Sequence, residues 1–571
     1  MNQPTPAIVA QGAVRRLPRS ALLLLCIAYV LPGFVGRAPW KSADMTAFGY
    51  MAQMARGATE WLSPRLLDLP PDVDALLPYW LGGWAMRLAP GWITPDFAAR
   101  IPFGLLLTLT LVATWYASYY LARSPAAQPV AFAFGGEALP PDYARAMADG
   151  SLLALIACLG LAQLSHETTP AQAQLCFVAL TFFGFTALPH RALLPLVSAA
   201  LGLTGLALSG APTIAALLGG GSAAIYLLER APAPAAARNK SLRAGASIAL
   251  LSALVVLLAS ALDLWRWRIE LPQASWAEWR SLGRLLLWFT WPAWPLALWT
   301  LWRWRHQLVQ SATPSRHLTL PLWFTGVALA ATFSTASADR SLLLALPALA
   351  ALAAFALPTL KRSVAALIDW FTLLFFSGCA FTIWVVWIAM QTGVPSQPAA
   401  NVARLAPGFQ PSFSLFPFVL ATAATLAWAW LVKWRVGRHR AAIWKSLVLP
   451  AGGAVLCFVL LMTLWLPLLD FARSYAPLVR RAMVLLQAPG CAETHGLSRG
   501  QIAAFQFHGH LTLKPATAAA SCPWLIVSQD ALPTLPEVVD PANWRLRGSA
   551  QHPTDRDETV LIFQRVAATP R

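Results

Sequence analysis

The feature that most constrains this chain is a series of apolar stretches, each about as long as a bilayer is thick. A membrane-spanning helix needs about 20 mostly apolar residues. Only 12% of the residues are charged, whereas soluble proteins carry about 25%. The sequence therefore predicts a polytopic α-helical membrane protein with about 13 transmembrane helices. It excludes a soluble enzyme, a disordered chain and a nucleic-acid-binding module. The predicted spans are centred on residues 21–36, 101–121, 150–164, 174–188, 192–209, 212–228, 244–262, 285–302, 318–335, 341–358, 364–390, 412–432 and 447–467.

The positions of Lys and Arg give these spans a direction, because basic residues concentrate in the cytoplasmic loops of membrane proteins. If the N-terminus is cytoplasmic, seven segments face the cytoplasm and together hold 20 Lys and Arg residues: 1–20, 122–149, 189–191, 229–243, 303–317, 359–363 and 433–446. The four short loops on the other side hold two. We therefore predict a cytoplasmic N-terminus and, because the number of spans is odd, a C-terminus on the outer side.

The first outer loop, residues 37–100, is long and rich in Pro and Trp. Within it, residues 44–56 carry apolar side chains at helical spacing, and residues 76–89 place Trp80 and Trp84 one helical turn apart. Both stretches predict short helices that lie in the plane of the membrane surface.

The tail, residues 470–571, has the composition of an ordinary globular domain. Its pattern predicts a small α/β domain, with a helix near 473–487, an apolar alternation typical of a strand at 502–507, and strands at 523–528 and 559–566. Cys491 and Cys522 are the only cysteines in the tail. Because an exported domain lies in an oxidising compartment, we expect a disulfide between them.

Charged residues at the outer rim are candidate functional residues, because a charge beside a membrane is costly to hold. Asp44 opens the first interfacial helix, where it could equally cap the helix N-terminus. His166 and Glu167 lie in the second outer loop, which could be an ordinary solvated turn. Asp339 and Arg340 lie in a five-residue outer loop, where Arg340 could instead snorkel beside its ion-pair partner.

Several stretches carry a more specific signal: Asp44 at the start of its helix, then 59–64 (TEWLSP), 77–80 (LPYW) and 96–102 (DFAARIP). In this order they resemble the first outer loop and second span of the GT-C glycosyltransferases that use polyprenyl-phosphate sugars. The most similar branches are the lipid A aminoarabinose transferases and the protein O-mannosyltransferases. The aminoarabinose branch also has 13 spans and an α/β tail outside the membrane.

The chain departs from that family at several positions. Met45 stands where the family usually has Glu, and the family's Thr-Thr-Asp is here 168–170 (TTP). The Glu-Lys-Pro element is absent, with Asp72 and Asp74 nearby, and the Lys of the family's Leu-Thr-Lys-Gly-Pro is missing from 208–212 (LSGAP). These departures suggest a substrate pair that differs from those of the known branches.

The resemblance implies a bacterial inner-membrane glycosyltransferase, with a GT-C-like transmembrane domain at 1–469 and a periplasmic tail at 470–571. It would move a hexose or pentose from a polyprenyl-phosphate donor to an acceptor on the periplasmic side (lipid A, a glycan or a protein), with inversion. Asp44 would be the general base, and Glu167 or His166 would position the acceptor or share a divalent metal ion.

The resemblance also implies where the donor binds. The leaving phosphate needs positive charge, which Arg340 would supply first and Arg56 or Arg65 next. Tyr79, Trp80, Asp72 and Asp74 would complete the substrate site. Membrane lipids are expected partners and nucleic acid is not.

Two other classes of protein stay open. A lipid or sugar transporter predicts charges at mid-membrane and inverted repeats, and few such charges and no repeat are found. A non-catalytic membrane scaffold would fit a chain whose motifs match the family only in part.

Overall fold

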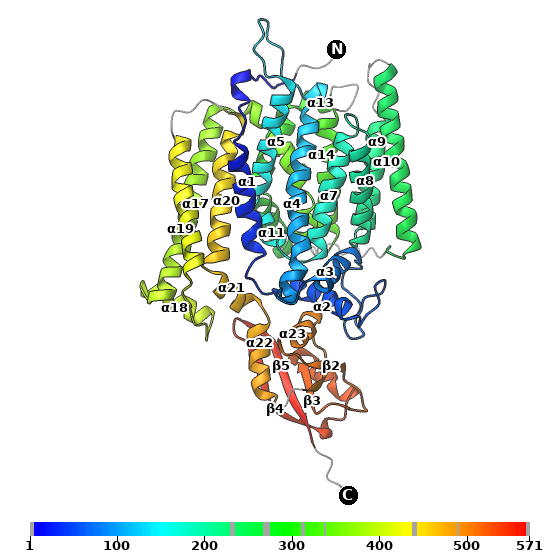
Figure 1. Ribbon diagram of the computed structural model, residues 1–571, viewed down its shortest axis with the longest axis vertical. Helices are drawn as coiled ribbons and strands as arrows, with labels where there is room; N and C mark the ends of the chain where they lie inside the picture. Colours follow the sequence, from blue (N-terminus) through cyan, green and yellow to red (C-terminus); the bar gives the residue numbers. More distant parts are fainter. Residues whose placement is uncertain are drawn as a thin grey trace.

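The structure is a computed structural model that describes residues 5–228, 235–265, 275–309, 315–335, 338–436, 442–487 and 490–566. Most of these residues form a bundle of helices, and a smaller domain containing a sheet hangs from one end of it (Figure 1). We call this end of the bundle the tail end. The bundle helices are α1 (Arg19–Val30), α4 (Pro95–Ala122), α5 (Pro140–Ala157), α6 (Leu159–Leu164), α7 (Pro170–Ala187), α8 (Leu193–Leu208), α9 (Pro212–Leu227), α10 (Ala235–Ala261), α11 (Trp276–Phe289), α12 (Ala293–Arg303), α13 (Arg305–Val309), α14 (Arg316–Ser334), α15 (Ala338–Leu343), α16 (Leu346–Ala354), α17 (Arg362–Thr392), α18 (Ser396–Leu405), α19 (Leu415–Val436) and α20 (Val448–Thr463).

Six helices within the described ranges are long and apolar enough to cross a membrane: Pro95–Ala122, Pro170–Ala187, Asn239–Ala261, Arg362–Thr392, Leu415–Arg435 and Ile443–Thr463. The chain is therefore a multi-pass membrane protein, as predicted. Helix is found in all the predicted intervals, but several intervals hold two short helices instead of one. One such break falls at Pro292, between α11 and α12, because proline has no N–H to donate to a helix. The number of crossings thus stays a prediction.

Helix α7 is the centre of the bundle, since 94% of its span is buried, against 22% for α17 and 11% for α19. The latter two lie at one edge of the bundle (Figure 1). Two glycines let α7 and α8 approach closely: a Cβ on Gly184 would come within 2.7 Å of the Ala199 nitrogen, and one on Gly202 within 2.6 Å of the Thr181 nitrogen. Small residues serve this purpose in membrane helix packing.

At the tail end, the first outer loop forms two helices where the sequence predicts them, α2 (Ala43–Arg56) and α3 (Leu77–Leu88), and both lie across the bundle (Figure 1). Their position in the plane of a membrane surface stays a prediction. The apolar stripe of α2 is buried, including Met45, Phe48 and Met51. It packs on α3 through Gly82, whose Cβ position would lie 2.2 Å from the Met51 sulfur. Helix α2 is therefore enclosed by protein on most of its surface.

The tail consists of α21 (Leu466–Arg473), α22 (Ala476–Leu485), α23 (Arg499–His508) and five strands: β1 (Cys491–His495), β2 (Thr512–Pro515), β3 (Trp524–Ser528), β4 (Trp544–His552) and β5 (Asp555–Arg565). The strand order is β2-β1-β3-β5-β4. Strand β1 pairs in parallel with β2 and β3, and β5 pairs antiparallel with β3 and β4. The predicted strands at 523–528 and 559–566 correspond to β3 and β5, and Cys491 and Cys522 are joined in a disulfide across 31 residues.

The strand expected at 502–507 is wrong, because this segment is the middle of α23. Ser498 and Gln501 form a capping box, in which the Ser498 hydroxyl accepts from the Gln501 N–H at 3.2 Å and the Gln501 side chain accepts from the Ser498 N–H at 3.0 Å. This arrangement satisfies the free N–H groups of the first helical turn and starts a helix there. The local capping signal outweighs the short apolar alternation.

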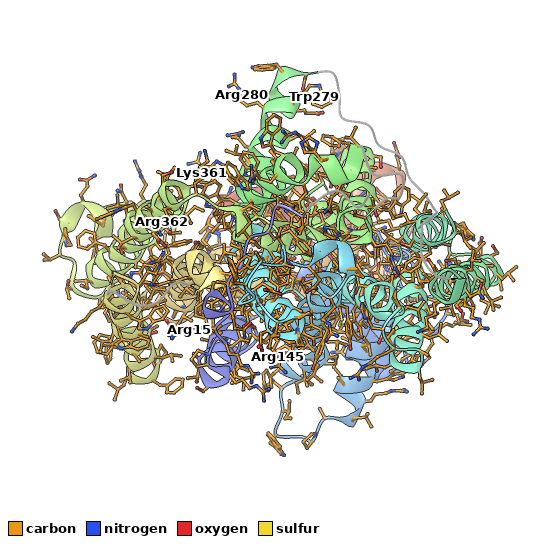
Figure 2. All side chains as sticks on the ribbon, turned by 90° about the horizontal axis from the view of Figure 1, so that it is seen from above. Arg15, Arg145, Trp279, Arg280, Lys361 and Arg362 are labelled. Atoms are coloured by element: carbon orange, nitrogen blue, oxygen red, sulfur yellow. A yellow bond between two sulfur atoms is a disulfide. The ribbon has the colours of Figure 1, made fainter. Side chains whose placement is uncertain are left out.

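The opposite end of the bundle gathers the segments predicted to be cytoplasmic. The Val130 N–H donates to Ala7 O at 2.9 Å, and the Trp444 indole donates to Arg15 O at 2.8 Å. Figure 2 looks down from this end of the bundle and labels Arg15, with Arg145 and Lys361 from two other predicted cytoplasmic segments. These predicted cytoplasmic segments thus lie together at one end of the bundle, as the distribution of Lys and Arg predicts. Which compartment each end faces stays a prediction.

Candidate active site

Asp44 lies in the first turn of α2, at the tail end, with its side chain about 1% exposed. Its Oδ2 accepts from the Arg37 guanidinium at 2.6 Å and from the Trp40 N–H at 3.1 Å. Its Oδ1 accepts from the Thr168 N–H at 2.8 Å and from the Thr168 hydroxyl at 2.5 Å. Asp44 is therefore no simple helix cap, because its carboxylate joins the first outer loop to the second.

The charge state of Asp44 follows from these contacts. Burial alone would raise the pKa of this carboxyl, but the charges of Arg37 and Arg100 and the hydrogen bonds from Thr168 outweigh it. The pKa of Asp44 consequently lies below its usual value, and the carboxylate is ionised at neutral pH.

Glu167 and Arg340, predicted separately, are brought together by the fold. Glu167 Oε2 lies 3.4 Å from the Arg340 guanidinium, and the two side chains are 8% and 32% exposed. The Asp339 side chain accepts from the Arg340 backbone N–H at 2.9 Å, while the Arg340 guanidinium reaches across to Glu167. The second outer loop therefore carries one end of an ion pair and is not a simple solvated turn.

His166 belongs to the packing of the bundle. Its Nε2 lies 3.0 Å from Tyr29 O and its Nδ1 2.5 Å from Ala162 O, and its ring contacts Phe34 and Phe458. Burial lowers the pKa of His166 to about 4, so the ring is neutral. The side chain is directed to these backbone carbonyls, while its own carbonyl accepts from Arg37 at 3.1 Å.

Three further arginines stand close to the two acids. Arg37 is described above, and Arg100, at the start of α4, is 2% exposed and pairs with Asp96 at 3.3 Å. Arg473, at the end of α21, feels the charge of Glu167 and lies 4.9 Å over the ring of Trp40. These arginines were not among the predicted site residues, although Arg100 is the Arg of the 96–102 motif and Arg37 directly follows the first predicted span.

Trp40 ties this cluster to the tail. The Arg37 guanidinium lies 4.4 Å from the centroid of the Trp40 ring, and the Arg473 guanidinium lies 4.9 Å from it. Its indole N–H donates to Asp470 at 2.7 Å, and the Lys41 N–H donates to Arg473 O at 2.6 Å. Residues near 40 and near 470 therefore form one wall of the site.

The remaining candidates do not join the cluster. Arg56 ends α2 and lies about 18 Å along the helix axis from Asp44, at 1.5 Å per residue. The Arg65 guanidinium donates to Asp68 O, and Trp80 donates to Trp61 O at 2.7 Å.

The acids and the tyrosine of the same loop also face other neighbours. Asp72 pairs with Arg499 of the tail at 2.6 Å, and the Tyr79 ring packs on Tyr50. The carbonyl of Asp74 lies against Gly210. These residues shape the first outer loop and its contact with the tail.

The site does not fit a divalent metal ion. Within the described ranges, no group of three or more His, Cys, Asp or Glu side chains converges. The carboxylates of Asp44 and Glu167 already face guanidinium groups, and the ring nitrogens of His166 face backbone carbonyls.

Two solved structures are similar to the whole chain. One is ArnT from Cupriavidus metallidurans in the apo state, with a TM-score of 0.58, 13% identity, and coverage of 97% of this chain and 99% of that one. The other is ArnT from the same organism bound to undecaprenyl phosphate, with a TM-score of 0.57, 13% identity, and coverage of 97% and 100%. No family model matches the chain, and no curated protein matches its sequence. This chain therefore has the fold of the lipid A aminoarabinose transferase ArnT, a GT-C fold, as its sequence motifs predict.

Proposed function

We propose that the protein is an inner-membrane glycosyltransferase that moves a sugar from a polyprenyl-phosphate donor to an acceptor at the tail end of the bundle. The observation that carries the proposal is the convergence of Asp44, Glu167 and four arginines at that end of a GT-C fold. The likeness to an ArnT structure bound to undecaprenyl phosphate supports the same class of donor.

In the proposed reaction, Asp44 accepts the proton of the acceptor hydroxyl. An acceptor that replaces the Thr168 hydroxyl on Oδ1 would stand within hydrogen-bond distance of the base, which is the geometry that proton transfer needs. The acceptor oxygen then attacks C1 of the sugar, the bond between C1 and the phosphate oxygen breaks, and the lipid phosphate leaves with the electron pair. Attack from the side opposite the phosphate inverts C1.

The leaving phosphate is assigned to Arg340. Of the ion pairs in the cluster, Arg37–Asp44 is 2.6 Å long and fully buried, and Arg100–Asp96 is 3.3 Å long with the arginine buried. The Arg340–Glu167 pair is the longest, at 3.4 Å, and Arg340 is 32% exposed. Arg340 can therefore turn from Glu167 to a phosphate, which its planar guanidinium binds with two hydrogen bonds.

Glu167 would hold the acceptor. It directly precedes Thr168, which binds Asp44, and its carboxylate can accept a hydrogen bond from a sugar or lipid hydroxyl. The N-terminus is assigned to the cytoplasm and the tail to the periplasm, and lipid A, a glycan and a protein are the acceptor classes to test.

The first experiment measures transfer of labelled sugar from a panel of polyprenyl-phosphate donors in membranes that carry wild type, Asp44→Asn or Asp68→Asn. Asp68 is an exposed acid of the same loop and serves as the matched control. Loss of a general base is expected to slow transfer about 100-fold or more. Asp68→Asn should transfer at the wild-type rate.

Each outcome bears on a different part of the proposal. Undiminished transfer by Asp44→Asn would move the base to another residue, with Glu167 next. If wild type at normal protein level transfers from no donor of the panel, the scaffold or transporter alternatives replace the transferase.

A further inference from the structure

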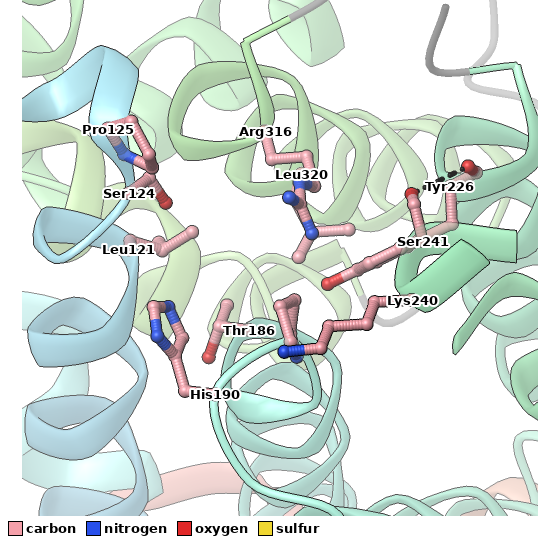
Figure 3. Close-up of a pocket in the computed structure, with 11 residues that line it drawn as sticks. Leu121, Ser124, Pro125, Thr186, His190, Tyr226, Lys240, Ser241, Arg316 and Leu320 are labelled. Carbon is pink, nitrogen blue, oxygen red and sulfur yellow. Dashed lines mark hydrogen bonds between the residues drawn. The ribbon is translucent and has the colours of Figure 1, made fainter. Parts of the chain in front are cut away.

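The end of the bundle opposite the candidate active site contains a cavity that the proposed reaction does not use. Its volume is about 200 Å³, and it lies between the ends of α4, α7, α9, α10 and α14 (Figure 3). One water molecule needs roughly 10–15 Å³ of such space. The cavity can therefore hold a group the size of a phosphate.

The polar lining of this cavity is basic. His190, Lys240 and Arg316 line it from three segments that are far apart in the sequence, and none of the described lining residues is acidic. In Figure 3 the ends of these three side chains point toward the same space. Lys240 and Arg316 are cationic side chains, so the cavity presents positive charge to a bound molecule.

The surrounding contacts hold this lining in place. The Arg316 guanidinium lies 5.0 Å over the Tyr226 ring, and the Tyr226 hydroxyl donates to Phe185 O at 2.5 Å. The Ser241 hydroxyl, next to Lys240 in the chain, donates to Tyr226 O at 3.1 Å. Arg316 and the start of α10 are thus both held against Tyr226, which lowers the entropic cost of binding.

His190 reports the electrostatics of the cavity. Burial lowers its pKa first, and the charges of Arg123 and Arg316 lower it further. This is consistent with the geometry, which places His190 beside Lys240 and Arg316 in one cavity. The His190 ring itself is held by a hydrogen bond to the Tyr120 backbone, so Lys240 and Arg316 are the side chains that would bind the anion directly.

The rest of the wall combines apolar side chains, among them Leu121 and Leu320, with the hydroxyl-bearing residues Ser124, Thr186, Tyr226 and Ser241. The ends of membrane-spanning helices lie at the depth of the lipid headgroups. A basic cluster beside apolar side chains at such an end can bind the phosphate group of a lipid. We propose that this cavity is a second anion site that binds a phosphate group, carried by an anionic phospholipid or free in solution, independently of the transfer reaction.

The test compares the purified full chain in detergent with three variants: Lys240→Gln, Arg316→Gln and Lys361→Gln. Lys361 is an exposed lysine of another predicted cytoplasmic segment that does not line the cavity, and it is the matched control. Native mass spectrometry measures binding of phosphatidylglycerol, and a thermal shift titration measures binding of inorganic phosphate. Phosphatidylcholine, which has no net charge, is the reference lipid.

Removal of one basic residue should weaken binding of the phosphate-bearing probe about fivefold in Lys240→Gln. Lys361→Gln and the phosphatidylcholine reference should show no change. If phosphatidylglycerol is the affected probe, the site takes a lipid headgroup. If inorganic phosphate is the affected probe, it takes a free anion.

The proposal is overturned if Lys240→Gln binds both probes as wild type does, or if Lys361→Gln loses as much binding as Lys240→Gln. Arg316→Gln also loses its contact with Tyr226, so its melting temperature is measured alongside. Should that variant unfold, Lys240→Gln decides the question by itself, because Lys240 is exposed.

Discussion

Arg37 and Asp44 form an ion pair 2.6 Å long in which each side chain is about 1% exposed. Arg37 lies in the loop that follows the first span, and Asp44 lies in the first turn of α2, so this pair joins the start of the first outer loop to its first helix. A buried charge without its partner is costly. The stability of the protein and its proposed chemistry therefore depend on the same two residues, and variants can separate the two effects.

Arg37→Met should lower the free energy of unfolding by about 3–5 kcal/mol, because it leaves the Asp44 carboxylate buried without its cation. The double variant Arg37→Met with Asp44→Leu should recover much of this loss, yet stay inactive. Thermal unfolding in detergent measures the stability, and the transfer assay measures activity. A double variant less stable than Arg37→Met would contradict this account.

The lowered pKa of Asp44 predicts how stability changes with pH. A group whose folded pKa is depressed contributes stability that is present above its unfolded pKa, about 3.9, and lost as the pH falls through its folded pKa. The difference in melting temperature between wild type and Asp44→Asn should be constant from pH 8 to pH 5. Below about pH 4 the melting temperature of wild type should fall relative to that of Asp44→Asn. A difference that already changes near pH 6 would mean that the pKa of Asp44 is raised.

Thr168→Val should remove the hydroxyl that donates to Asp44 at 2.5 Å while it keeps the backbone N–H at 2.8 Å. A hydrogen bond to a charged group contributes about 1.5–3 kcal/mol, so the variant should be destabilised by that amount. Thr168→Ser retains the hydroxyl and should behave nearly as wild type. Equal melting temperatures for Thr168→Val and Thr168→Ser would show that the Thr168 hydroxyl contributes nothing to stability.

Arg340→Gln should reduce kcat/KM for the polyprenyl-phosphate donor about 100-fold, the effect of removing one group that stabilises a developing negative charge. Arg56→Gln is the matched control, since Arg56 is exposed and far along α2 from Asp44. Initial rates measured at varied donor concentration give kcat/KM for each of the two variants. Loss of activity in Arg56→Gln with none in Arg340→Gln would exchange the roles of the two arginines.

Removal of the disulfide by Cys491→Ser with Cys522→Ser should destabilise the tail by about 3–4 kcal/mol, the chain-entropy value for a loop of this length. Without the disulfide the tail should open more often and expose its backbone to protease. Limited proteolysis of the full chain should therefore release tail fragments faster from the double variant than from wild type. A rate equal to that of wild type would show that the sheet holds the tail without the bond.

The parts of the structure that are predictable from sequence are those set by neighbouring residues. The bilayer imposes a fixed length on each span, so apolar runs locate the helices, and the Met and Phe spacing in 44–56 locates α2. The failure at 502–507 has a local cause, because two polar residues upstream of the apolar alternation form a capping box. Ser498 and Gln501 are the sequence signal for the helix.

The site was predictable only in part, because its members meet through packing. Asp44, Glu167 and Arg340 stand out in the sequence as charges at the rim, but nothing in their spacing shows that Glu167 pairs with Arg340, 173 residues away. Arg473 lies in a tail helix, where a basic residue is unremarkable. His166 stands next to Glu167 in the chain, yet its ring is directed at Tyr29 O, since consecutive residues at the end of a helix point in different directions.

The bond from Trp40 to Asp470 spans 430 residues of chain, and this separation has a consequence for biosynthesis. Synthesis proceeds at about 5–20 residues per second, so Trp40 is made roughly 20–90 seconds before its partner. Throughout that interval α2 has α3 but lacks α23, against which Phe48 and Gly49 pack in the finished protein. The bilayer surface is then the natural place for this face of α2, which the completed tail covers with protein. The wall of the site is thus finished only when the last fifth of the chain has left the ribosome.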